Sequence, residues 1–474
     1  MSAVSQNKLK ENTLRLFDVI IMAIAGTAPA YTLAATTGVI VAAVGLASPA
    51  AILYAAIPMV GVAWSFSQLN KCDTDAGASY SWVGGSISPV MGFLAGWALL
   101  VAATLFMVAG TLPAGTATLD LLAPQYVDNT AIVTLIGAFW FLLMNYLVLR
   151  GITITVRAQW IMTIAEVLLL LVFGIAGLFK FHGALAANHF SLAWIFSIKQ
   201  FSISTFAAGA VIAAFFYWGW DVTANLSEET ESTKKVTGIG TMVGMVILIA
   251  IFIMFVVMAQ MGLSVKELSE ADNIFPALGQ KIFGGKLGDL LVLALILSTV
   301  ATLETTLIQV TRTLFSMGRD KVIPQVFSSI HERWGTPWAA SLLITTLGII
   351  FFVLSNFISS VGDILTIAIN AISLQVIFYY GLACISMAII YKNYAKRSFK
   401  DMFLYKIWPL FSAIYLIVLG IYDLPQLGLT TDFVGIGLIL VGLIPAYIAK
   451  RKGVEFFTKN TIDISEMEHL KLSK

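Results

Sequence analysis

Long apolar stretches alternate with short polar ones along almost the whole chain. Many of these stretches exceed the roughly 18 residues that indicate a helix long enough to cross a bilayer. Because lipid offers backbone amides no hydrogen-bonding partner, helices are the expected spanning elements. Charges and Gly/Pro clusters delimit twelve predicted spans: 15–44, 48–69, 88–118, 131–149, 158–179, 201–227, 237–262, 287–315, 338–357, 362–391, 404–422 and 433–449. We therefore expect an all-α integral membrane protein with 12 transmembrane helices.

The composition excludes several other classes of protein. Apolar residues make up 59% of the chain and charged residues 11%, against about 45–50% and about 25% in average soluble domains. The formal net charge of +2 leaves no basic stripe for nucleic acid, and Cys72 and Cys384 cannot form a disulfide framework. No metal-binding histidine spacing, Walker loop or GxSxG motif occurs. We expect no catalytic residue, no cofactor, no metal site and no nucleic-acid partner.

The distribution of basic residues predicts the orientation in the membrane. If both termini lie inside, all but five of the 28 Lys and Arg residues fall on inner segments, as the positive-inside rule requires. The five outside are Lys180, Lys199, Lys266, Lys281 and Lys286. The polar start of the chain has no cleavage site of the signal-peptide type, so the first apolar stretch should remain as a span. We expect a multi-pass protein of the cytoplasmic membrane with both termini in the cytoplasm.

Two of the predicted spans are interrupted near their middle. The first contains Gly26-Thr27-Ala28-Pro29, where Pro29 lacks an N–H and Gly26 gives the backbone freedom to unwind. The sixth contains Gly219 followed by Trp220 and Asp221. A simple proline kink is the alternative for the first span. Since the interrupted spans are five apart, the pattern indicates a transporter with a 5+5 inverted repeat whose helices 1 and 6 are broken at the midplane.

This repeat divides the chain into five parts. The expected parts are a cytoplasmic N-terminal segment at 1–14, a first five-helix repeat at 15–180, a second, inverted repeat at 201–391, helices 11 and 12 at 403–449, and a cytoplasmic tail at 450–474.

Three ionisable residues lie at membrane depth: Glu166, Asp221 and Glu304. An intramembrane carboxylate is costly and is therefore a functional candidate by default. Glu166 shares a helix face with Gln159 and Thr163, so it is expected to point inward. The alternative for Glu166 and Glu304 is a protonated carboxyl that only joins two helices, and for Asp221 a helix N-cap.

Four motifs in the expected order resemble those of the amino acid–polyamine–organocation permeases. They are Gly26-Thr27-Ala28; Asp75-Ala76-Gly77-Ala78-Ser79-Tyr80-Ser81-Trp82 followed by Gly92-Phe93-x-x-Gly96-Trp97; Gly219-Trp220-Asp221 with Glu228-Glu229; and Arg312-x-Leu-Phe-x-Met-Gly-Arg319-Asp320 continuing to Gly335-Thr336-Pro337. The motif Gly219-Trp220-Asp221, followed by Glu228-Glu229, is most similar to the corresponding stretch in bacterial relatives of cationic amino acid transporters. The resemblance covers nearly the whole chain and implies a LeuT-like 5+5 repeat followed by two C-terminal helices.

The resemblance also implies where a substrate binds. Its α-carboxylate would lie on amides near Thr27 and Ala28, and its amine on carbonyls near Ile24 and between Phe216 and Trp218. Trp218 or Trp220 would be a gating aromatic residue. The implied substrate-binding residues are Ile24, Gly26, Thr27, Ala28, Phe216, Trp218, Gly219, Trp220 and Asp221.

A second site for a proton or cation is implied at Glu166, Glu304 and Thr305. Two positions depart from the family pattern. Ala28 replaces the usual second glycine of the break, which weakens the expectation for carboxylate recognition. Glu166 takes the place of a lysine that serves as a built-in cation in some proton-coupled relatives, so Glu166 is expected to carry the proton or to balance a cationic substrate.

These features predict a secondary active transporter of an amino acid or related amine. It would work by alternating access, through proton symport or exchange, with the lipid bilayer and a small molecule as its partners. The alternatives are a polyamine transporter, sodium coupling through Thr305 and Thr306, and a non-transporting amino acid sensor. The substrate and the oligomeric state are not readable from the sequence.

Overall fold

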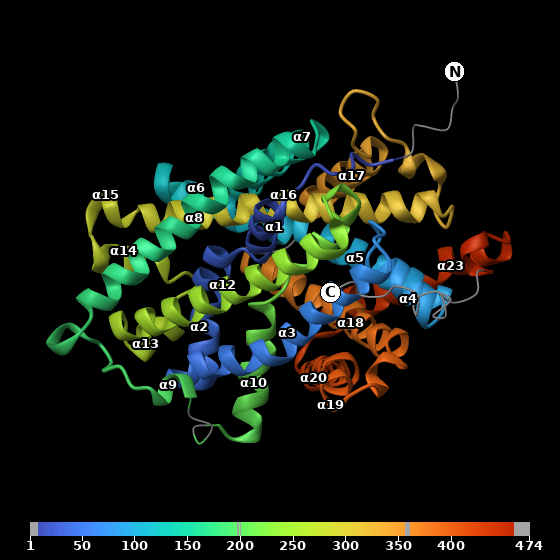
Figure 1. The fold of residues 1–474 in the computed structure, drawn as a ribbon. Coiled ribbons are helices and arrows are strands. Elements are labelled where there is room, and N and C mark those ends of the chain that lie inside the picture. Colours follow the sequence, from blue (N-terminus) through green and yellow to red (C-terminus); the bar gives the residue numbers. More distant parts are fainter. Residues whose placement is uncertain (1–7, 197–198, 200, 356–360, 459–474) are drawn as a thin grey trace.

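The computed structural model describes residues 8–196, 199, 201–355 and 361–458 (Figure 1). The outer parts of the predicted terminal segments, 1–7 and 459–474, lie outside the described residues. In the described part of the chain the regular elements are helices. In addition, two isolated β-bridges pair Leu14 with Thr230 and Ile330 with Pro337. The all-helical prediction is thus confirmed for these residues.

The α-helices are α1 (Leu16–Thr27), α2 (Pro29–Val44), α3 (Ser48–Cys72), α4 (Ser79–Ser86), α5 (Pro89–Ala109), α6 (Thr111–Leu122), α7 (Thr130–Leu149), α8 (Ile152–Lys180), α9 (Ala193–Phe196), α10 (Ile203–Phe215), α11 (Val222–Asn225), α12 (Thr233–Gly262), α13 (Val265–Ser269), α14 (Phe275–Ile282), α15 (Gly285–Gly288), α16 (Leu290–Arg319), α17 (Trp338–Ser355), α18 (Val361–Ile390), α19 (Phe399–Met402), α20 (Trp408–Asp423), α21 (Leu429–Asp432), α22 (Leu438–Val441) and α23 (Leu443–Arg451). Short 3-10 or π turns are η1 (Gly45–Ala47), η2 (Pro124–Tyr126), η3 (Gly183–Leu185), η4 (Ser227–Glu229), η5 (Gln325–Ser328), η6 (Tyr394–Lys396), η7 (Phe403–Ile407), η8 (Leu424–Gln426), η9 (Phe433–Gly437) and η10 (Glu455–Phe457).

Nine helical segments of the described chain are long and apolar enough to cross a membrane. One of them, Leu16–Cys72, covers the first two predicted spans. The sixth and ninth predicted spans fall on the shorter apolar helices Ser204–Ala214 and Trp338–Leu354. The chain is therefore a multi-pass membrane protein, and the count of twelve stays a prediction.

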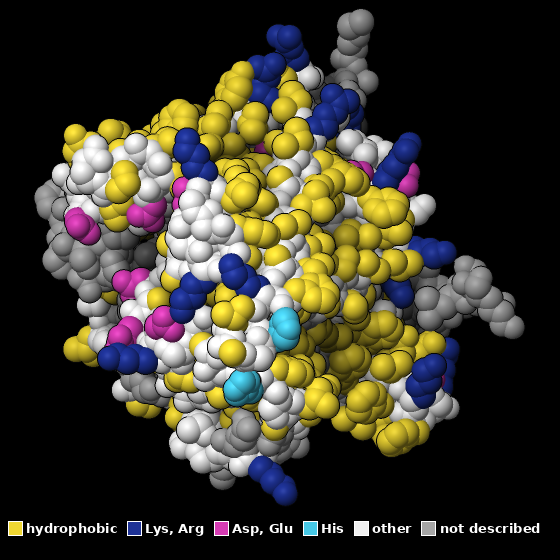
Figure 2. All heavy atoms as spheres, turned by 90° about the vertical axis from the view of Figure 1, so that its left-hand side faces the viewer, with side chains coloured by type: hydrophobic (Ala, Val, Ile, Leu, Met, Phe, Trp, Pro, Cys, Tyr) yellow, Lys and Arg dark blue, Asp and Glu magenta, His cyan; other side chains and the backbone are white. Residues whose placement is uncertain are grey.

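Helix α8 shows how the sequence divides between lipid and protein. Its exposed apolar side chains recur every three or four residues, the period of one helix face. From Ile161 onwards they are Ile161, Ile164, Leu168, Val172, Ile175 and Phe179, and Ile154 precedes them by two turns. Gln159, Thr163 and Glu166 lie on the opposite, buried face. Figure 2 shows a broad apolar area on the side of the molecule that it presents, as expected for a surface in contact with lipid.

Helix α16 runs through the centre of the molecule (Figure 1). It is buried over nearly its whole length and packs against α8, α6, α5, α7, α1 and α2. Other close pairs are α3 with α12, α18 with α5 and α20, and α1 with α12. This packing brings α1, α8, α16 and α18 around the two interrupted segments described next.

Candidate functional site

The first interruption separates α1 from α2 at Ala28. Ala28 adopts the left-handed conformation, with φ of 50°, and its N–H donates to the Ala25 carbonyl at 3.2 Å. Pro29 is the first residue of α2, where its missing N–H costs nothing. The break therefore falls within the Gly26–Pro29 motif that the sequence singles out, at a residue whose left-handed conformation does not continue an α-helix.

The second interruption lies between α10 and α11. Gly219 has φ of 102° there, a conformation that favours glycine. A Cβ atom added to Gly219 would overlap the carbonyl oxygen of Gly26, and one added to Gly26 would overlap that of Gly219. The two interruptions are thus in direct backbone contact, although 193 positions separate these glycines in the sequence.

Glu166 joins α8 to the first interruption. Its Oε1 accepts a hydrogen bond from the Ala30 N–H at 2.9 Å, and the next amide, that of Tyr31, donates to Ser298 Oγ at 3.1 Å. Glu166 is fully buried, and its Oε2 has no hydrogen-bond partner. This carboxyl therefore lies at the N-terminus of α2, where the helix dipole favours negative charge.

Asp221 connects the second interruption to two long helices. Its Oδ2 accepts from Gln309 Nε2 at 2.7 Å and from the Tyr379 hydroxyl at 3.0 Å, and its Oδ1 accepts from the Tyr380 hydroxyl at 2.8 Å. Asp221 occupies the N-cap position of α11, but its side chain makes no capping bond there. Asp221 instead holds α16 and α18 against the segment that precedes α11.

The two candidate gating residues have different surroundings. Trp220 is fully buried, and its indole N–H donates to the Tyr217 carbonyl at 2.7 Å. Trp218 keeps a small exposed fraction, and its indole N–H donates to the Tyr379 hydroxyl at 3.0 Å. The Trp218 ring meets Phe106 edge to face at 5.3 Å. Trp218 also lines a cavity between α3, α10, α18 and α20, whereas Trp220 is not among the residues that line it.

The remaining sequence-predicted residues are buried around these contacts. Thr27 donates to the Ala23 carbonyl, and Ile24 and Phe216 pack in the core. Glu304 is fully buried, and neither carboxyl oxygen has a hydrogen-bond partner. Thr305 donates its hydroxyl to the Thr302 carbonyl at 2.9 Å. Glu166 therefore bonds directly to the segment at the interruption, whereas the hydroxyl of Thr305 bonds within α16.

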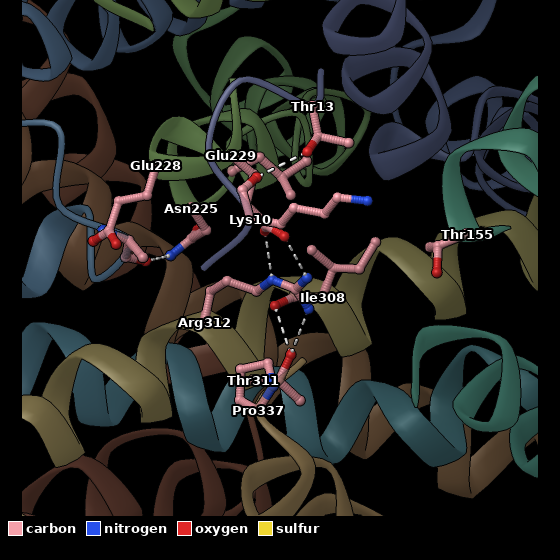
Figure 3. Close-up of polar contacts among 12 residues, drawn as sticks. Lys10, Thr13, Thr155, Asn225, Glu228, Glu229, Ile308, Thr311, Arg312 and Pro337 are labelled. Atoms are coloured by element: carbon pink, nitrogen blue, oxygen red, sulfur yellow. Dashed lines mark hydrogen bonds and ion pairs between the residues drawn. The ribbon is translucent and has the colours of Figure 1, made fainter. Parts of the chain in front are cut away.

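A buried ion pair beside the N-terminal segment was not predicted from the sequence. Arg312 donates from Nε to Glu229 Oε2 at 2.9 Å and from Nη2 to Glu229 Oε1 at 3.1 Å, with exposed fractions of 1% and 0% (Figure 3). The Glu229 carbonyl accepts from the amides of Thr13 and Leu14 at 2.8 and 3.0 Å. The pair thus fixes η4 to α16 and, through the backbone, to the segment that leads into α1. The two sequence motifs that contain Arg312 and Glu229 do not indicate that these residues form an ion pair.

A second, half-buried cluster lies next to this pair. Arg319 binds Asp75 and Glu228, each at 2.7 Å. Asp73 is close to this cluster, in the loop after α3. Burial, followed by the negative charge of Asp75, raises the pKa of Asp73 to about 7. Two carboxylates thus share one guanidinium, and the carboxyl of Asp73 lies near them.

Replacing Asp73 with asparagine is expected to flatten the dependence of stability on pH. The pKa of Asp73 is raised on folding, so the folded state binds more protons and loses stability as pH rises from about 4 to about 7. This group contributes at most about 1.4 kcal/mol per pH unit to that loss. The midpoint of thermal unfolding, measured in detergent from pH 5 to 8, should fall less steeply in Asp73→Asn than in the wild type. Asp128→Asn, at an exposed loop position, is the control, and equal slopes in all three proteins would contradict the prediction.

Comparison with known proteins gives the family. A family model described as amino acid permease matches residues 14–444. The chain is 26% identical over 410 residues to the low-affinity putrescine importer PlaP of Escherichia coli, covering 85% of this chain and 86% of that protein. It is 25% identical to the methylthioribose transporter of Bacillus subtilis, covering 80% and 83%, and 28% identical to the serine/threonine exchanger SteT of the same organism, covering 54% and 58%. The chain therefore belongs to the amino acid permease family, a group of transporters and not of enzymes, within the amino acid–polyamine–organocation superfamily.

Proposed function

We propose that this protein is a secondary transporter that moves an amino acid or a related amine across the cytoplasmic membrane by alternating access. The observation that carries the proposal is the contact between Gly26 and Gly219, where two interrupted helices meet inside an apolar helical protein. Interrupted helices present free backbone groups at membrane depth, as transporters of small polar molecules require. The names of PlaP and SteT, an importer and an exchanger, support the same activity.

The proposed architecture has 12 transmembrane helices with both termini in the cytoplasm. Two inverted repeats of five helices would place the interruptions of helices 1 and 6 opposite each other, followed by helices 11 and 12. Substrate would contact the interruption through Ile24, Gly26, Thr27, Ala28, Phe216, Trp218 and Gly219. Trp218 would close over it, whereas Asp221 and Trp220 would act as positioning residues because their polar atoms are held by protein groups.

Proton coupling is proposed to work through Glu166. One of its oxygens accepts the Ala30 N–H and the other has no partner, so a proton gained or lost there acts directly on the N-terminus of α2. Glu304, with two unpartnered oxygens, is proposed as a second protonatable group. Sodium coupling through Thr305 and Thr306 is the alternative, since both donate their hydroxyl hydrogens to the Thr302 carbonyl and keep their oxygen lone pairs for a cation.

Replacing Glu166 with glutamine is expected to abolish concentrative uptake while leaving exchange largely intact. A gradient of one pH unit supports accumulation of about ten-fold in one-to-one proton symport, because it supplies about 1.4 kcal/mol. In proteoliposomes the accumulation ratio of Glu166→Gln should fall towards one. Counterflow of labelled substrate, which needs no proton gradient, should persist.

The matched control is Glu270→Gln, at an exposed residue after α13. It should retain both uptake and exchange. Equal losses of uptake and exchange in Glu166→Gln would argue against coupling at this residue. Failure of the wild type to exchange any amino acid or amine would refute the transport proposal itself.

A further inference from the structure

The segment that joins α18 to α20 carries an excess of positive charge. Positions 392–406, here called the basic segment, contain one acidic residue, Asp401, and five basic ones. The basic residues are Lys392, Lys396, Arg397, Lys400 and Lys406, and all five are exposed. Within the described chain, none of them forms an ion pair with a carboxylate. The basic segment therefore presents cations that the described part of the protein does not neutralise.

The one carboxylate of the basic segment is engaged at the start of α19. Asp401 Oδ2 accepts a hydrogen bond from the Ser398 hydroxyl at 2.8 Å, and the Asp401 amide donates to Ser398 Oγ at 3.0 Å. A carboxylate in the first turn of a helix interacts with the positive end of the helix dipole. Asp401 is thus held at the helix end, and the surface of the segment remains positive.

Exposed apolar side chains lie among these cations. Phe399 is 75% exposed, and Met402, Phe403 and Ile407 are 36–43% exposed. The exposed apolar face continues along α20 with Phe411, Ile414, Ile417, Val418, Ile421 and Tyr422. Residues Phe399–Asp423 together form a helical segment long and apolar enough to cross a bilayer. We therefore expect this face to contact acyl chains and the cations at its start to lie at the level of the lipid headgroups.

Three tyrosines hold the basic segment in a defined conformation. The rings of Tyr391 and Tyr405 stack at 5.0 Å, and Tyr394 meets Tyr405 edge to face at 4.7 Å. The Tyr391 hydroxyl donates to the Gln68 carbonyl at 3.0 Å, which fixes this cluster to α3. The Arg397 guanidinium lies over the Tyr394 ring, 4.4 Å from its centroid. The segment is thus arranged before a ligand binds, which lowers the entropic cost of binding.

The combination of charge and apolar surface favours a phospholipid over a second copy of the chain as the occupant. A two-fold symmetric contact places the same surface of both copies against each other. The cations of the two basic segments would then repel, whereas an anionic headgroup neutralises them. The acyl chains of a phospholipid would also cover the apolar face that begins at Phe399.

We propose that the basic segment binds the headgroup of an anionic phospholipid, whose acyl chains lie along α19 and the start of α20. Lys396, Arg397 and Lys400 would contact the phosphate and the charged headgroup. Lys406 follows Phe403 by three residues, so it lies on the apolar face and would reach the headgroup through its alkyl chain. This lipid site is independent of the transported substrate.

The test measures binding of phosphatidylglycerol to the purified full-length protein in detergent, with phosphatidylcholine as the zwitterionic reference. Native mass spectrometry counts the bound lipids and gives their affinities. The wild type should bind phosphatidylglycerol more than about ten-fold more tightly, because each basic residue near an anionic lipid surface contributes about five-fold. The triple variant Lys396→Gln/Arg397→Gln/Lys400→Gln should lose this preference.

The matched control removes three charges from another exposed basic cluster. Lys450→Gln/Arg451→Gln/Lys452→Gln changes the end of α23 and should keep the affinity for phosphatidylglycerol within about two-fold. Equal affinities of the wild type for the two lipids, or equal losses in both triple variants, would overturn the proposal. It would also be overturned if lipid-free wild type were a dimer that the Lys396→Gln/Arg397→Gln/Lys400→Gln variant does not form. Thermal unfolding without added lipid checks that both variants are folded.

Discussion

Replacing Arg312 with methionine is expected to lower the free energy of unfolding by about 3–5 kcal/mol, because the change leaves the buried Glu229 carboxylate without a partner. The guanidinium makes two hydrogen bonds to that carboxylate, and both side chains are excluded from solvent. Methionine fills a similar volume, so the loss reflects charge more than packing. Denaturant unfolding in detergent, followed by tryptophan fluorescence, measures the change.

Two controls separate this effect from a general sensitivity to losing charge. Arg15 lies 3.9 Å from Glu231 with both side chains exposed, and Arg15→Met is expected to cost about 0–1 kcal/mol. The double variant Arg312→Met/Glu229→Met should recover most of the stability, because a buried ion pair is often replaceable by apolar residues. A single variant as stable as the wild type, or a double variant no better than the single one, would contradict this account.

The sequence predicted the positions of the two interruptions because local chemistry determines them. Pro29 lacks an amide, and Gly26 and Gly219 tolerate conformations and close contacts that other residues do not. The lipid-facing side of α8 is likewise predictable, since its apolar residues follow the helical period. From this period alone, Glu166 was expected to point inward, which is where it lies.

The partners of the buried polar groups were not predictable in the same way. Asp221 is bound by Gln309, Tyr379 and Tyr380, which lie 88 to 159 positions further along the chain. No local pattern reports which helix packs against which, so neither these donors nor the Arg312–Glu229 pair could be assigned. Only the packing of α16 and α18 against the second interruption brings them together.

Gly219→Ala is expected to be the most damaging change at the contact between the interruptions. The new Cβ would overlap the Gly26 carbonyl oxygen, and the backbone at position 219 has φ of 102°. Backbone strain of about 1–3 kcal/mol and overpacking of about 1–3 kcal/mol together predict a loss of about 2–6 kcal/mol in stability. Any folded fraction should have lost counterflow, since the two interruptions must move apart to admit the methyl group.

Two other glycines distinguish strain from steric overlap. Gly45 also has a positive φ, of 57°, but nothing lies within 4 Å of the position of an added Cβ. Gly45→Ala should therefore show the cost of strain alone and keep counterflow. Gly381 lies inside α18, its φ is not in the positive range, and no atom lies within 4 Å of the position of an added Cβ. Gly381→Ala should therefore be neutral or should stabilise the protein by up to about 1 kcal/mol. If Gly219→Ala behaved like Gly45→Ala in both stability and counterflow, the contact between the two interruptions would not be the feature on which transport depends.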